Sequence, residues 1–565
     1  MSLRIGVTWD ADGASAWHTA CVDQLVAVPG IELALLIEAR REGGDAGEAL
    51  SWLPGRKTRT PRQRVAPPGA QLLSEYQRIA GRIDVAGTGC LVLTAEQVDR
   101  VRQADLDCIV HLAGAGPAAA LCAAARFGVW SIHHGDGVNY SPGPITDWEP
   151  HCRGPVLHVA LIATLGDGSP SMALQEGRLR IASTPWPTAL EPVLQCAAQW
   201  PAKVIREALD FGESALARAR PAQLARAQRR SGQRALGRGL YRFRVECHRL
   251  LIRWLGTWRE DQWAIGIVDA PIHAFVDAPV ARPTAWVPEY SRDEYLADPF
   301  ALRSYEGVVI HCERFDHRTR RGEICAVESP DGRRFGRPRT VLALPAHLSY
   351  PFPFEHEGAL YCIPEMGQSG GIQLFELVSA TGTWCFVATL IEGVAGIDPT
   401  ILRYGDCLWL FCTTRDNPNA ALQIWWAPAL TGPWRPHRRN PVKFDVRSTR
   451  PAGSPFEHGG QVFRPSQDCS ETYGGAIHIN RIVRLTVDDY EEESVAVVRP
   501  DAKGPYPAGL HTLSALGDWT LIDGKRRRWR SPWQPRGIAA PQAEALRQAL
   551  GRLRPAGAGR GDGGA

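Results

Sequence analysis

The sequence lacks any long apolar run of the kind that a membrane-spanning helix needs. No stretch of about eighteen consecutive apolar residues occurs in its 565 residues. The opening residues, Met-Ser-Leu-Arg-Ile-Gly-Val, also lack the features of a secretory signal peptide. We therefore expect a soluble, cytoplasmic protein.

Paired cysteines and an excess of charge are absent as well. The 14 cysteines include no Cys-x-x-Cys pair, and most of them lie in apolar segments. This pattern is typical of reduced, buried thiols, so we expect neither disulfides nor a metal site. The 64 basic residues are nearly balanced by 60 acidic ones. Bulk nucleic-acid binding therefore receives no support.

The N-terminal third alternates short apolar runs with helix-forming segments. We expect strands and helices to alternate over residues 3–8, 14–28, 31–37, 90–94, 95–103, 106–112, 118–125 and 128–133. Such alternation predicts a parallel sheet with flanking helices, an α/β domain that we place at residues 1–200. Ligands of these sheets bind beyond the carboxyl ends of the strands, and Ser131, His133, His134 and Asp136 lie at one such end.

This domain resembles the formyltransferase fold of methionyl-tRNA and sugar-nucleotide formyltransferases over roughly its first 190 residues. The resemblance rests on Asp-Leu-Asp-Cys-Ile-Val, an Ala-rich helix, Gly-Val-Trp-Ser-Ile-His133 and Tyr140-Ser-Pro-Gly-Pro. It implies that His133 is the motif histidine and that Ser131 stands where the family has an asparagine. A matching aspartate is also missing, so formyl transfer lacks two of its groups. We expect a domain that keeps the formyltransferase fold but has a changed or lost reaction.

Residues 201–260 are rich in Ala, Arg and Leu and predict helices with one cationic face. One interpretation is a solvated basic linker between two domains. The other is an amphipathic surface that makes a peripheral contact with anionic lipid or an acidic polymer. Beyond the second domain, residues 536–565 predict a helix and then a disordered tail rich in Gly and Ala.

One short phrase recurs in the second half at steps of about fifty residues, the length of a four-stranded propeller blade. It reads Ala-Asp298-Pro-Phe, Ser-Tyr350-Pro-Phe, Ile-Asp398-Pro-Thr, Thr-Arg450-Pro-Ala and Leu-His511-Thr-Leu. Strand-like runs and turn signals fill the intervals, so we predict an all-β five-bladed propeller over residues 261–535. The first strand of each blade lines the central channel, where polar residues at the repeated position converge.

The repeat region resembles the N-terminal region of plant glucosamine inositolphosphorylceramide transferases over about 260 residues. The phrases that carry this resemblance include Arg-Gly-Glu323-Ile, His347-Leu-Ser-Tyr-Pro-Phe, Ile-Pro-Glu365 and Arg464-Pro-Ser-Gln-Asp468-Cys, in this order. The Asp-Pro phrases also resemble, more distantly, those of five-bladed arabinanases, xylosidases and invertases. Both resemblances imply a propeller that handles sugars.

The repeated carboxylates suit chemistry at a glycosidic bond. Such a reaction needs one carboxylate near the anomeric carbon and a second acid or base near the oxygen that leaves or arrives. We assign Asp298 as nucleophile, base or cation-stabilising carboxylate, and Glu365 as proton-transfer partner, with Glu313 as its substitute. Asp398 would orient sugar hydroxyls and shift the pKa of its neighbours. The residues expected to bind substrate are His347, Tyr350, Arg450, Arg464, Gln467, Asp468 and His511.

Each of these side chains also has a structural interpretation. An Asp before a Pro often caps a turn. His347 and His511 can act as hydrogen-bonding groups of the channel wall, and Arg450 can pair with Asp468 inside the fold. The repetition favours the functional interpretation, because filling the channel floor with apolar side chains would avoid the free-energy cost of burying polar groups.

Arg450 and Arg464 suit the diphosphate of an activated donor, which a hydrolase of neutral glycans does not need. We therefore predict a glycosyltransferase-like enzyme that moves a sugar from a nucleotide-linked donor to a glycan, lipid or natural-product acceptor. The N-terminal domain would aid donor or acceptor binding. The alternatives are a glycoside hydrolase of arabinanase or invertase type, an N-formyltransferase that acts on an amino sugar, and a carbohydrate-binding scaffold. Only the N-formyltransferase would use formyl-tetrahydrofolate; for the others we expect no required cofactor.

Overall fold

The computed structural model divides the chain into two compact units, Met1–Leu250 and Leu251–Ala565. The residues that it describes are 2–10, 16–41, 77–83, 90–113, 116–117, 119–141, 155–166, 168–181, 190–224, 247, 259–378, 382–529, 546, 549–550 and 552–553. The predicted disordered tail and most of the predicted linker beyond residue 224 lie outside the described residues. Within these ranges, no helix is both long enough and apolar enough to cross a membrane.

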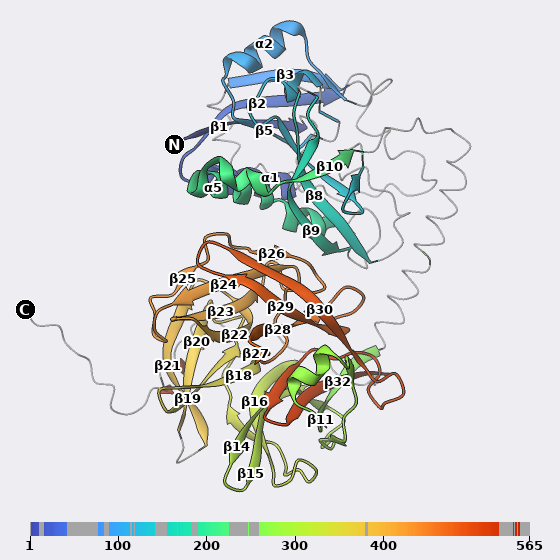
Figure 1. Ribbon diagram of the computed structural model, residues 1–565, viewed down its shortest axis with the longest axis vertical. Coiled ribbons are helices and arrows are strands. Elements are labelled where there is room, and N and C mark those ends of the chain that lie inside the picture. The colour runs from blue at the N-terminus through green and yellow to red at the C-terminus, as the bar shows by residue number, and fades with distance from the viewer. Residues whose placement is uncertain are drawn as a thin grey trace, which may run out of the picture. The chain divides into compact units, whose positions relative to one another are not determined.

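Unit 1 begins with strands and helices that alternate along the chain (Figure 1). They are β1 (Leu3–Asp10), α1 (Ala16–Val26), β2 (Ile31–Arg41), β3 (Gln77–Ile83), β4 (Leu91–Val92), α2 (Ala95–Gln103), β5 (Cys108–His111), α3 (Ala119–Cys122) and β6 (Val129–Gly135). The pairs β1–β2, β1–β5, β2–β3 and β5–β6 are parallel. Helix α2 begins with a capping box between Thr94 and Gln97 and buries Val101 against Ile37 and Ile109 of the sheet.

The rest of unit 1 departs from the predicted parallel sheet. It contains β7 (Asn139–Tyr140), β8 (Val156–Thr164), β9 (Ser171–Arg180), α4 (Glu191–Ala197), α5 (Trp200–Phe211), a 3-10 helix (Gly212–Arg218) and β10 (Arg220–Leu224). Because β8 runs antiparallel to both β6 and β9, the ten-stranded sheet is mixed. Strand β10 pairs with β9, and α5 buries Val204 and Ile205. Residues 201–224 therefore belong to unit 1 rather than to a linker, because α5 is partly buried and β10 joins the sheet of the unit.

Unit 2 contains the predicted five blades, each a small sheet. The first three are β14 (Glu294–Ser304), β15 (Gly307–Asp316), β16 (Arg321–Ser329) and β17 (Arg339–Leu342); β18 (Ser349–His356), β19 (Ala359–Glu365), β20 (Gly371–Val378) and β21 (Thr383–Glu392); and β22 (Gly396–Tyr404), β23 (Cys407–Thr414), β24 (Ala421–Ala427), β25 (Arg435–Pro436) and β26 (Lys443–Phe444). The fourth is β27 (Phe456–His458), β28 (Gln461–Asp468), β29 (Ala476–Leu485), β30 (Tyr490–Pro500) and β12 (Val280–Ala281). The inner strands β14, β18 and β22 contact one another in sequence, and β14 also contacts β31.

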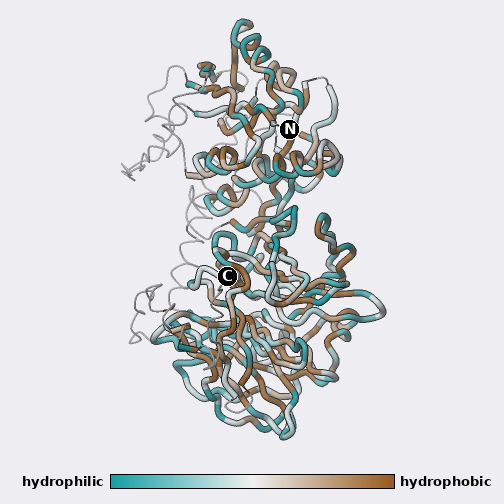
Figure 2. Tube along the Cα trace, turned by 90° about the vertical axis from the view of Figure 1, so that its left-hand side faces the viewer, coloured by the Kyte–Doolittle hydropathy of each residue, from teal (hydrophilic) through white to brown (hydrophobic). Residues whose placement is uncertain are grey.

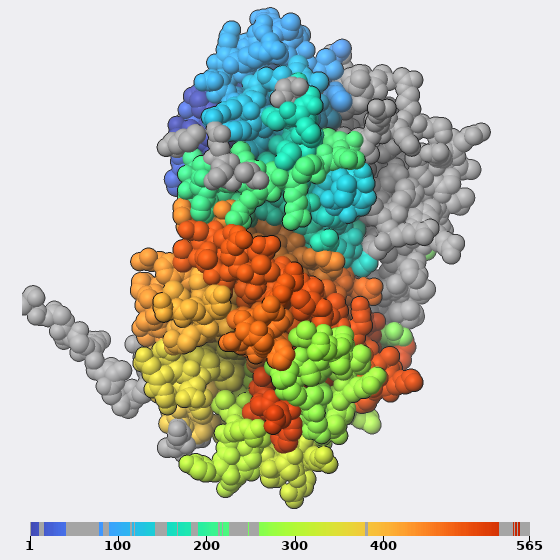
Figure 3. All heavy atoms as spheres, viewed as in Figure 1, coloured from blue at the N-terminus to red at the C-terminus, as the bar shows by residue number. Residues whose placement is uncertain are grey.

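The fifth blade joins the two ends of unit 2. Strand β11 (Arg259–Val268) pairs antiparallel with β32 (Trp519–Trp529) along its whole length. The short strands β13 (Ala285–Trp286) and β31 (Leu513–Leu516) flank this pair. In Figure 3, red residues from the end of the chain lie against green residues from the start of unit 2. Hydrogen bonds between the first and last long strands thus close the ring of blades.

Apolar side chains fill the spaces between neighbouring blades. One cluster joins Phe300, Ile363 and Leu410 of the first three blades, and another joins Ile310 of the first blade to Leu521 of the fifth. In Figure 2, hydrophobic stretches of the trace run through the interior of unit 2. This packing fixes the inner strands and therefore the side chains that they direct to the axis.

Candidate functional site

The inner strands of three blades bend at the repeated phrase. The ladders β14–β15, β18–β19 and β22–β23 shift register there, and Asp298, Tyr350 and Asp398 take left-handed φ angles of 51°, 45° and 48°. This conformation is strained for a residue that precedes proline. Each bend presents a backbone N–H to a carboxylate: Asp298 to Asp523 at 3.1 Å, Tyr350 to Asp298 at 3.1 Å and Asp398 to Glu365 at 3.4 Å.

We call the polar side chains gathered at these bends the hub. They are Asp298, Glu313, Glu365, Asp398, Arg450, Gln467, His511 and Asp523. They come from positions between residues 298 and 523 and from all five blades. The predicted catalytic residues Asp298, Glu365 and Asp398 therefore lie together at the hub, where the repeat predicted them.

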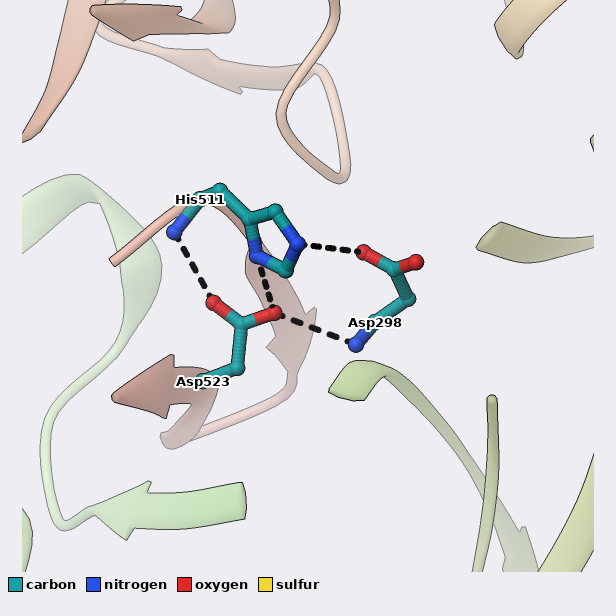
Figure 4. Close-up of side chains that lie close together, drawn as sticks. All are labelled: Asp298, His511 and Asp523. Carbon is teal, nitrogen blue, oxygen red and sulfur yellow. Dashed lines mark hydrogen bonds and ion pairs between the residues drawn. The ribbon is translucent and has the colours of Figure 1, made fainter. Parts of the chain in front are cut away.

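Asp298, His511 and Asp523 form a chain of interactions on one side of the hub (Figure 4). His511 Nδ1 lies 2.5 Å from Asp523 Oδ2, and Nε2 lies 3.6 Å from Asp298 Oδ1. Burial would lower the pKa of His511, but the two carboxylates outweigh it and raise that pKa. Burial, with repulsion from Asp398 and Asp523, raises the pKa of Asp298 to about 6, although His511 opposes the shift.

These three residues are also the group of His and acidic side chains that could hold a metal ion among the described residues. The surroundings of Asp523 argue for a hydrogen-bonded chain instead. Its Oδ1 accepts the backbone N–H groups of His511 and Thr512, both at 2.9 Å, and its Oδ2 accepts that of Asp298. With these donors and the imidazole of His511 in place, the carboxylate has little capacity left for a cation.

Glu365, Asp398 and Arg450 form the opposite side of the hub. Arg450 donates from Nε to Asp398 Oδ2 at 2.6 Å and from Nη2 to Glu365 Oε2 at 3.4 Å. Burial, followed by repulsion from Asp398, raises the pKa of Glu365 well above its ordinary value, and Arg450 only partly opposes this. The structural expectation that Arg450 pairs with Asp468 is therefore wrong, because its guanidinium binds the hub carboxylates.

Two predicted substrate-binding residues hold the hub together. Gln467 donates from Nε2 to Asp398 at 2.7 Å and to the carbonyl of Pro451 at 3.0 Å. The hydroxyl of Tyr350 accepts the N–H of Gly453 at 2.7 Å and lies 2.9 Å from Thr400 Oγ1. Both side chains are buried, so their observed contacts tie neighbouring blades to one another.

Arg464 and Asp468 lie apart from the hub's interactions. The Arg464 side chain is 1% exposed and pairs with the equally buried Glu492 at 2.6 Å. It also donates to the carbonyls of Ser448 and Thr449. Asp468 lies 3.5 Å from His478. The expectation of a diphosphate clamp from Arg464 is therefore wrong, because its guanidinium is committed inside the fourth blade.

Asp523 of the hub, and two aromatic rings packed against the hub, are groups that the sequence did not reveal as site residues. Asp523 is followed by glycine, a pair that usually indicates a turn, yet it lies within β32. Trp263 of β11 stacks on His511 with ring centroids 3.9 Å apart, and Tyr473 packs edge-on against both. Arg450 lies over the Tyr473 ring at 5.0 Å. The continuous buried stretches of β11 and β32 were the available signal, but they do not identify a hub position.

Solvent reaches the hub mainly on the side of Glu365. The side chains of Glu365 and Arg450 are 12% and 11% exposed, whereas that of Asp398 is 2% exposed. His347 is 33% exposed and lies beside the buried Glu313, 3.6 Å from its Oε1. A ligand would therefore approach from the side where His347, Glu365 and Arg450 lie.

Of the four residues predicted for a pocket in unit 1, Ser131, His133 and Asp136 make local hydrogen bonds. Ser131 Oγ lies 2.6 Å from His133 Nε2, and His133 Nδ1 lies 2.9 Å from the carbonyl of Ser141. Asp136 accepts the backbone N–H groups of residues 138 and 139, which lowers its pKa to about 2. Burial lowers the pKa of His134 to about 4. Ser131, His133 and His134 lie within β6 rather than in the predicted loop, although His133 does contact a backbone carbonyl as that prediction expected.

Comparison with known proteins gives a match over unit 2. Residues 273–506 match the family model for the N-terminal region of glucosamine inositolphosphorylceramide transferase 1. The transferase of that name from Oryza sativa subsp. japonica is 32% identical over 216 residues, which are 37% of this chain and 29% of the relative. The one from Arabidopsis thaliana is 30% identical over 208 residues, 36% of this chain and 27% of the relative.

Solved structures with a similar fold include sugar-cleaving enzymes. The family 117 glycoside hydrolase Zg3597 from Zobellia galactanivorans has a TM-score of 0.32 and 13% identity, covering 51% of this chain and 97% of that protein. The Cellvibrio cellulosa α-L-arabinanase has a TM-score of 0.27 and 16% identity, covering 35% of this chain and 77% of that protein. By sequence, then, this chain is similar over its propeller to the N-terminal region of plant glucosamine inositolphosphorylceramide transferases, and it spans less than a third of their length.

Proposed function

We propose that the hub transfers a glycosyl group from an activated, nucleotide-linked donor to a hydroxyl group of an acceptor. The observation that carries the proposal is the meeting of Asp298, Glu365 and Asp398 from three consecutive blades. Burial and repulsion from Asp398 raise the pKa of Glu365 and so favour its protonated form, whereas Asp298, with a pKa of about 6, is mostly ionised at neutral pH. A protonated acid near an ionised carboxylate is the combination that glycosyl chemistry requires.

In this proposal each hub residue has a role set by its contacts. Asp298 stabilises the positive charge that develops at the anomeric carbon, and Glu365, the more exposed carboxyl, exchanges a proton with the leaving or arriving oxygen. Asp398 is held by Arg450 and Gln467, so it positions Arg450 beside Glu365. The names of the plant relatives support transfer to a lipid acceptor, which we extend to this chain as part of the proposal.

Hydrolysis of a glycosidic bond is the second candidate, and the position of Arg464 favours it. The expected pair of arginines was the sequence argument for a diphosphate-bearing donor. Arg464 is committed to Glu492, and Arg450 is bound to two hub carboxylates. A hub without a free guanidinium pair suits a neutral leaving group as well as a charged one.

For unit 1 we propose a formyltransferase-like domain that aids donor or acceptor binding. Both ring nitrogens of His133 have close partners, Ser131 and the carbonyl of Ser141. A histidine engaged in this way is poorly suited to take a proton from an attacking amine. This favours a binding role over formyl transfer, and with it no need for formyl-tetrahydrofolate.

Product analysis with the full chain tests the proposal. Nucleotide-sugars are supplied with and without methyl glycosides or an inositol-containing lipid, and the products are followed by proton NMR of the anomeric centre and by nucleoside diphosphate release. We expect a glycosylated acceptor, with turnover reduced by about 100-fold or more in Asp298→Asn and Glu365→Gln. Glu323→Gln is the matched control, because Glu323 pairs with Arg314 of the neighbouring strand within the first blade. Free sugar in place of the glycosylated acceptor would favour hydrolysis, and turnover in Asp298→Asn equal to that of the wild type would contradict both functions.

A further inference from the structure

Glu313 on β15 is a hub carboxyl that the proposed roles leave unused. The residue is 4% exposed, and within the described part of the chain its buried Oε1 has no hydrogen-bond partner. Leaving such an atom unpaired costs free energy, so a native structure that retains one calls for a functional explanation. The charged groups that act on Glu313 are Asp298, Glu365, Asp398 and Asp523, from four different strands.

His347 supplies the group that faces this carboxyl. Its Nδ1 accepts the backbone N–H of Gly322 at 2.8 Å, so the proton of the neutral ring resides on Nε2. Nε2 lies 3.6 Å from Glu313 Oε1, too long for a direct hydrogen bond. Burial, together with the charges of Arg450 and Arg321, lowers the pKa of His347 to about 4, which keeps the ring neutral and Nε2 a donor.

Gly322 makes this arrangement possible. A Cβ atom at residue 322 would lie 2.3 Å from the carbonyl oxygen of Leu348, 2.4 Å from Glu313 Oε1 and 2.9 Å from His347 Cε1. Any other residue would therefore push the strand away from both side chains. The phrase Arg-Gly-Glu323-Ile, one of those that carry the family resemblance, thus acquires a physical reason for its glycine.

We propose that Glu313 Oε1 and His347 Nε2–H form the binding subsite for the acceptor hydroxyl, with Glu313 as the base that removes its proton. An oxygen about 2.8 Å from both atoms fits the apex of a triangle whose base is their 3.6 Å separation. Such an oxygen accepts from His347 and donates to Glu313. His347 is 33% exposed and Glu313 only 6%, so the subsite connects the exposed side to the hub.

The proposed deprotonation rests on the glycosyl transfer proposed above, and each bond that forms in it is matched by a bond that breaks. The acceptor O–H bond breaks and its proton moves to the ionised carboxylate of Glu313. The acceptor oxygen forms the new bond to the anomeric carbon, while the bond from that carbon to the leaving diphosphate oxygen breaks and its electron pair leaves with the diphosphate. Glu313 then loses the proton to solvent. Burial and the neighbouring carboxylates raise the pKa of Glu313 well above its ordinary value, which favours the protonated form. The step therefore starts from the ionised form of Glu313, which the raised pKa makes the stronger base.

The first experiment tests the subsite without any turnover. Histidine-labelled full chain is titrated with methyl glycosides as hydroxyl probes, and the ring signals of His347 are followed by heteronuclear NMR. We expect a saturable shift of the Nε2 signal that is lost in Glu313→Gln and retained in the control Glu323→Gln. If Glu313→Gln does not fold, His347→Gln at its partly exposed position serves instead, with loss of probe binding measured by calorimetry. A wild-type His347 signal that no methyl glycoside moves would overturn the proposal, even if the protein transfers sugars.

The second experiment tests the base. Azide is a nucleophile with no proton to remove, so it should restore donor turnover in Glu313→Gln by about tenfold or more while leaving Asp298→Asn inactive. The expected product is the glycosyl azide. Equal rescue of both variants, or none in Glu313→Gln when the wild type is active, would overturn the assignment of Glu313 as the base.

Discussion

Replacing Asp298 by asparagine tests whether this carboxylate, which we assign to catalysis, lowers the free energy of unfolding of the protein. The pKa of Asp298 is raised from an ordinary 3.8 to about 6, first by burial and then by neighbouring carboxylates. A carboxyl whose pKa is higher in the folded state than in the unfolded state binds protons more tightly when folded. The free energy of unfolding therefore falls as pH rises between these two values. At a pH above both, the penalty amounts to about 3 kcal/mol.

Asp298→Asn removes this penalty and weakens the hydrogen bonds of the side chain. Asp298 Oδ1 accepts from Thr512 Oγ1 at 2.8 Å, Oδ2 accepts from Tyr350 N at 3.1 Å, and an amide keeps only one such oxygen. The lost bond costs about 1–2 kcal/mol at every pH, so the sign of the net effect depends on pH. The variant should gain about 2 kcal/mol relative to the wild type between about pH 4.5 and about pH 7.5.

Urea titration of the full chain at a series of pH values measures this difference. Hydrogen exchange of peptides from β14 and β32 reports the unfolding of unit 2 separately from that of unit 1. Asp406→Asn, at an exposed turn between β22 and β23, is the matched control and should show no such pH dependence. A stability difference between Asp298→Asn and the wild type that stays constant across this pH range would refute the reasoning that a buried, destabilised carboxylate occupies the hub.

Two further substitutions test contacts that hold the blades together. Arg464→Met leaves Glu492 without its main partner in a buried ion pair, and we expect unit 2 to lose about 3–5 kcal/mol. A thermal midpoint equal to that of the wild type would contradict this. Tyr350→Phe removes the hydroxyl that accepts the N–H of Gly453, and it should cost about 1–3 kcal/mol in urea denaturation with unchanged far-ultraviolet circular dichroism. A neutral result would show that the hydroxyl does not stabilise this junction between blades.

The repeat predicted the hub because three of its five copies, at Asp298, Tyr350 and Asp398, mark the same bend of an inner strand. Asp298 and Asp398 precede proline at the same bend of their inner strands, so a pattern in the sequence maps directly onto a place in the fold. The same reasoning failed for Arg464. Its phrase looked like part of the site, but its partner Glu492 lies 28 residues further along the chain, and spacing alone does not reveal that pairing.

In unit 1 the strand–helix alternation indicated the parallel strands near the N-terminus but not the antiparallel part of the sheet. Strand β8 pairs antiparallel with both β6 and β9, and the composition of these strands does not specify their direction. The helix at residues 200–211 was hidden for a different reason. The arginine and alanine content of the longer segment 201–260 suggested a solvated linker, whereas burial of Val204 and Ile205 ties this helix to the unit.

Because β11 pairs with β32 near the end of the chain, the hub can form only late in protein synthesis. The carboxylate of Asp523 accepts the backbone N–H of Asp298 from 225 residues further along the chain, and Asp523 lies on the strand that completes the fifth blade. The ribosome must therefore make nearly all of the propeller before the bend at Asp298 gains its acceptor. A chain that stops before Trp519 would leave β11 with an unpaired edge, so truncation should yield an aggregating open ring rather than a weakened enzyme.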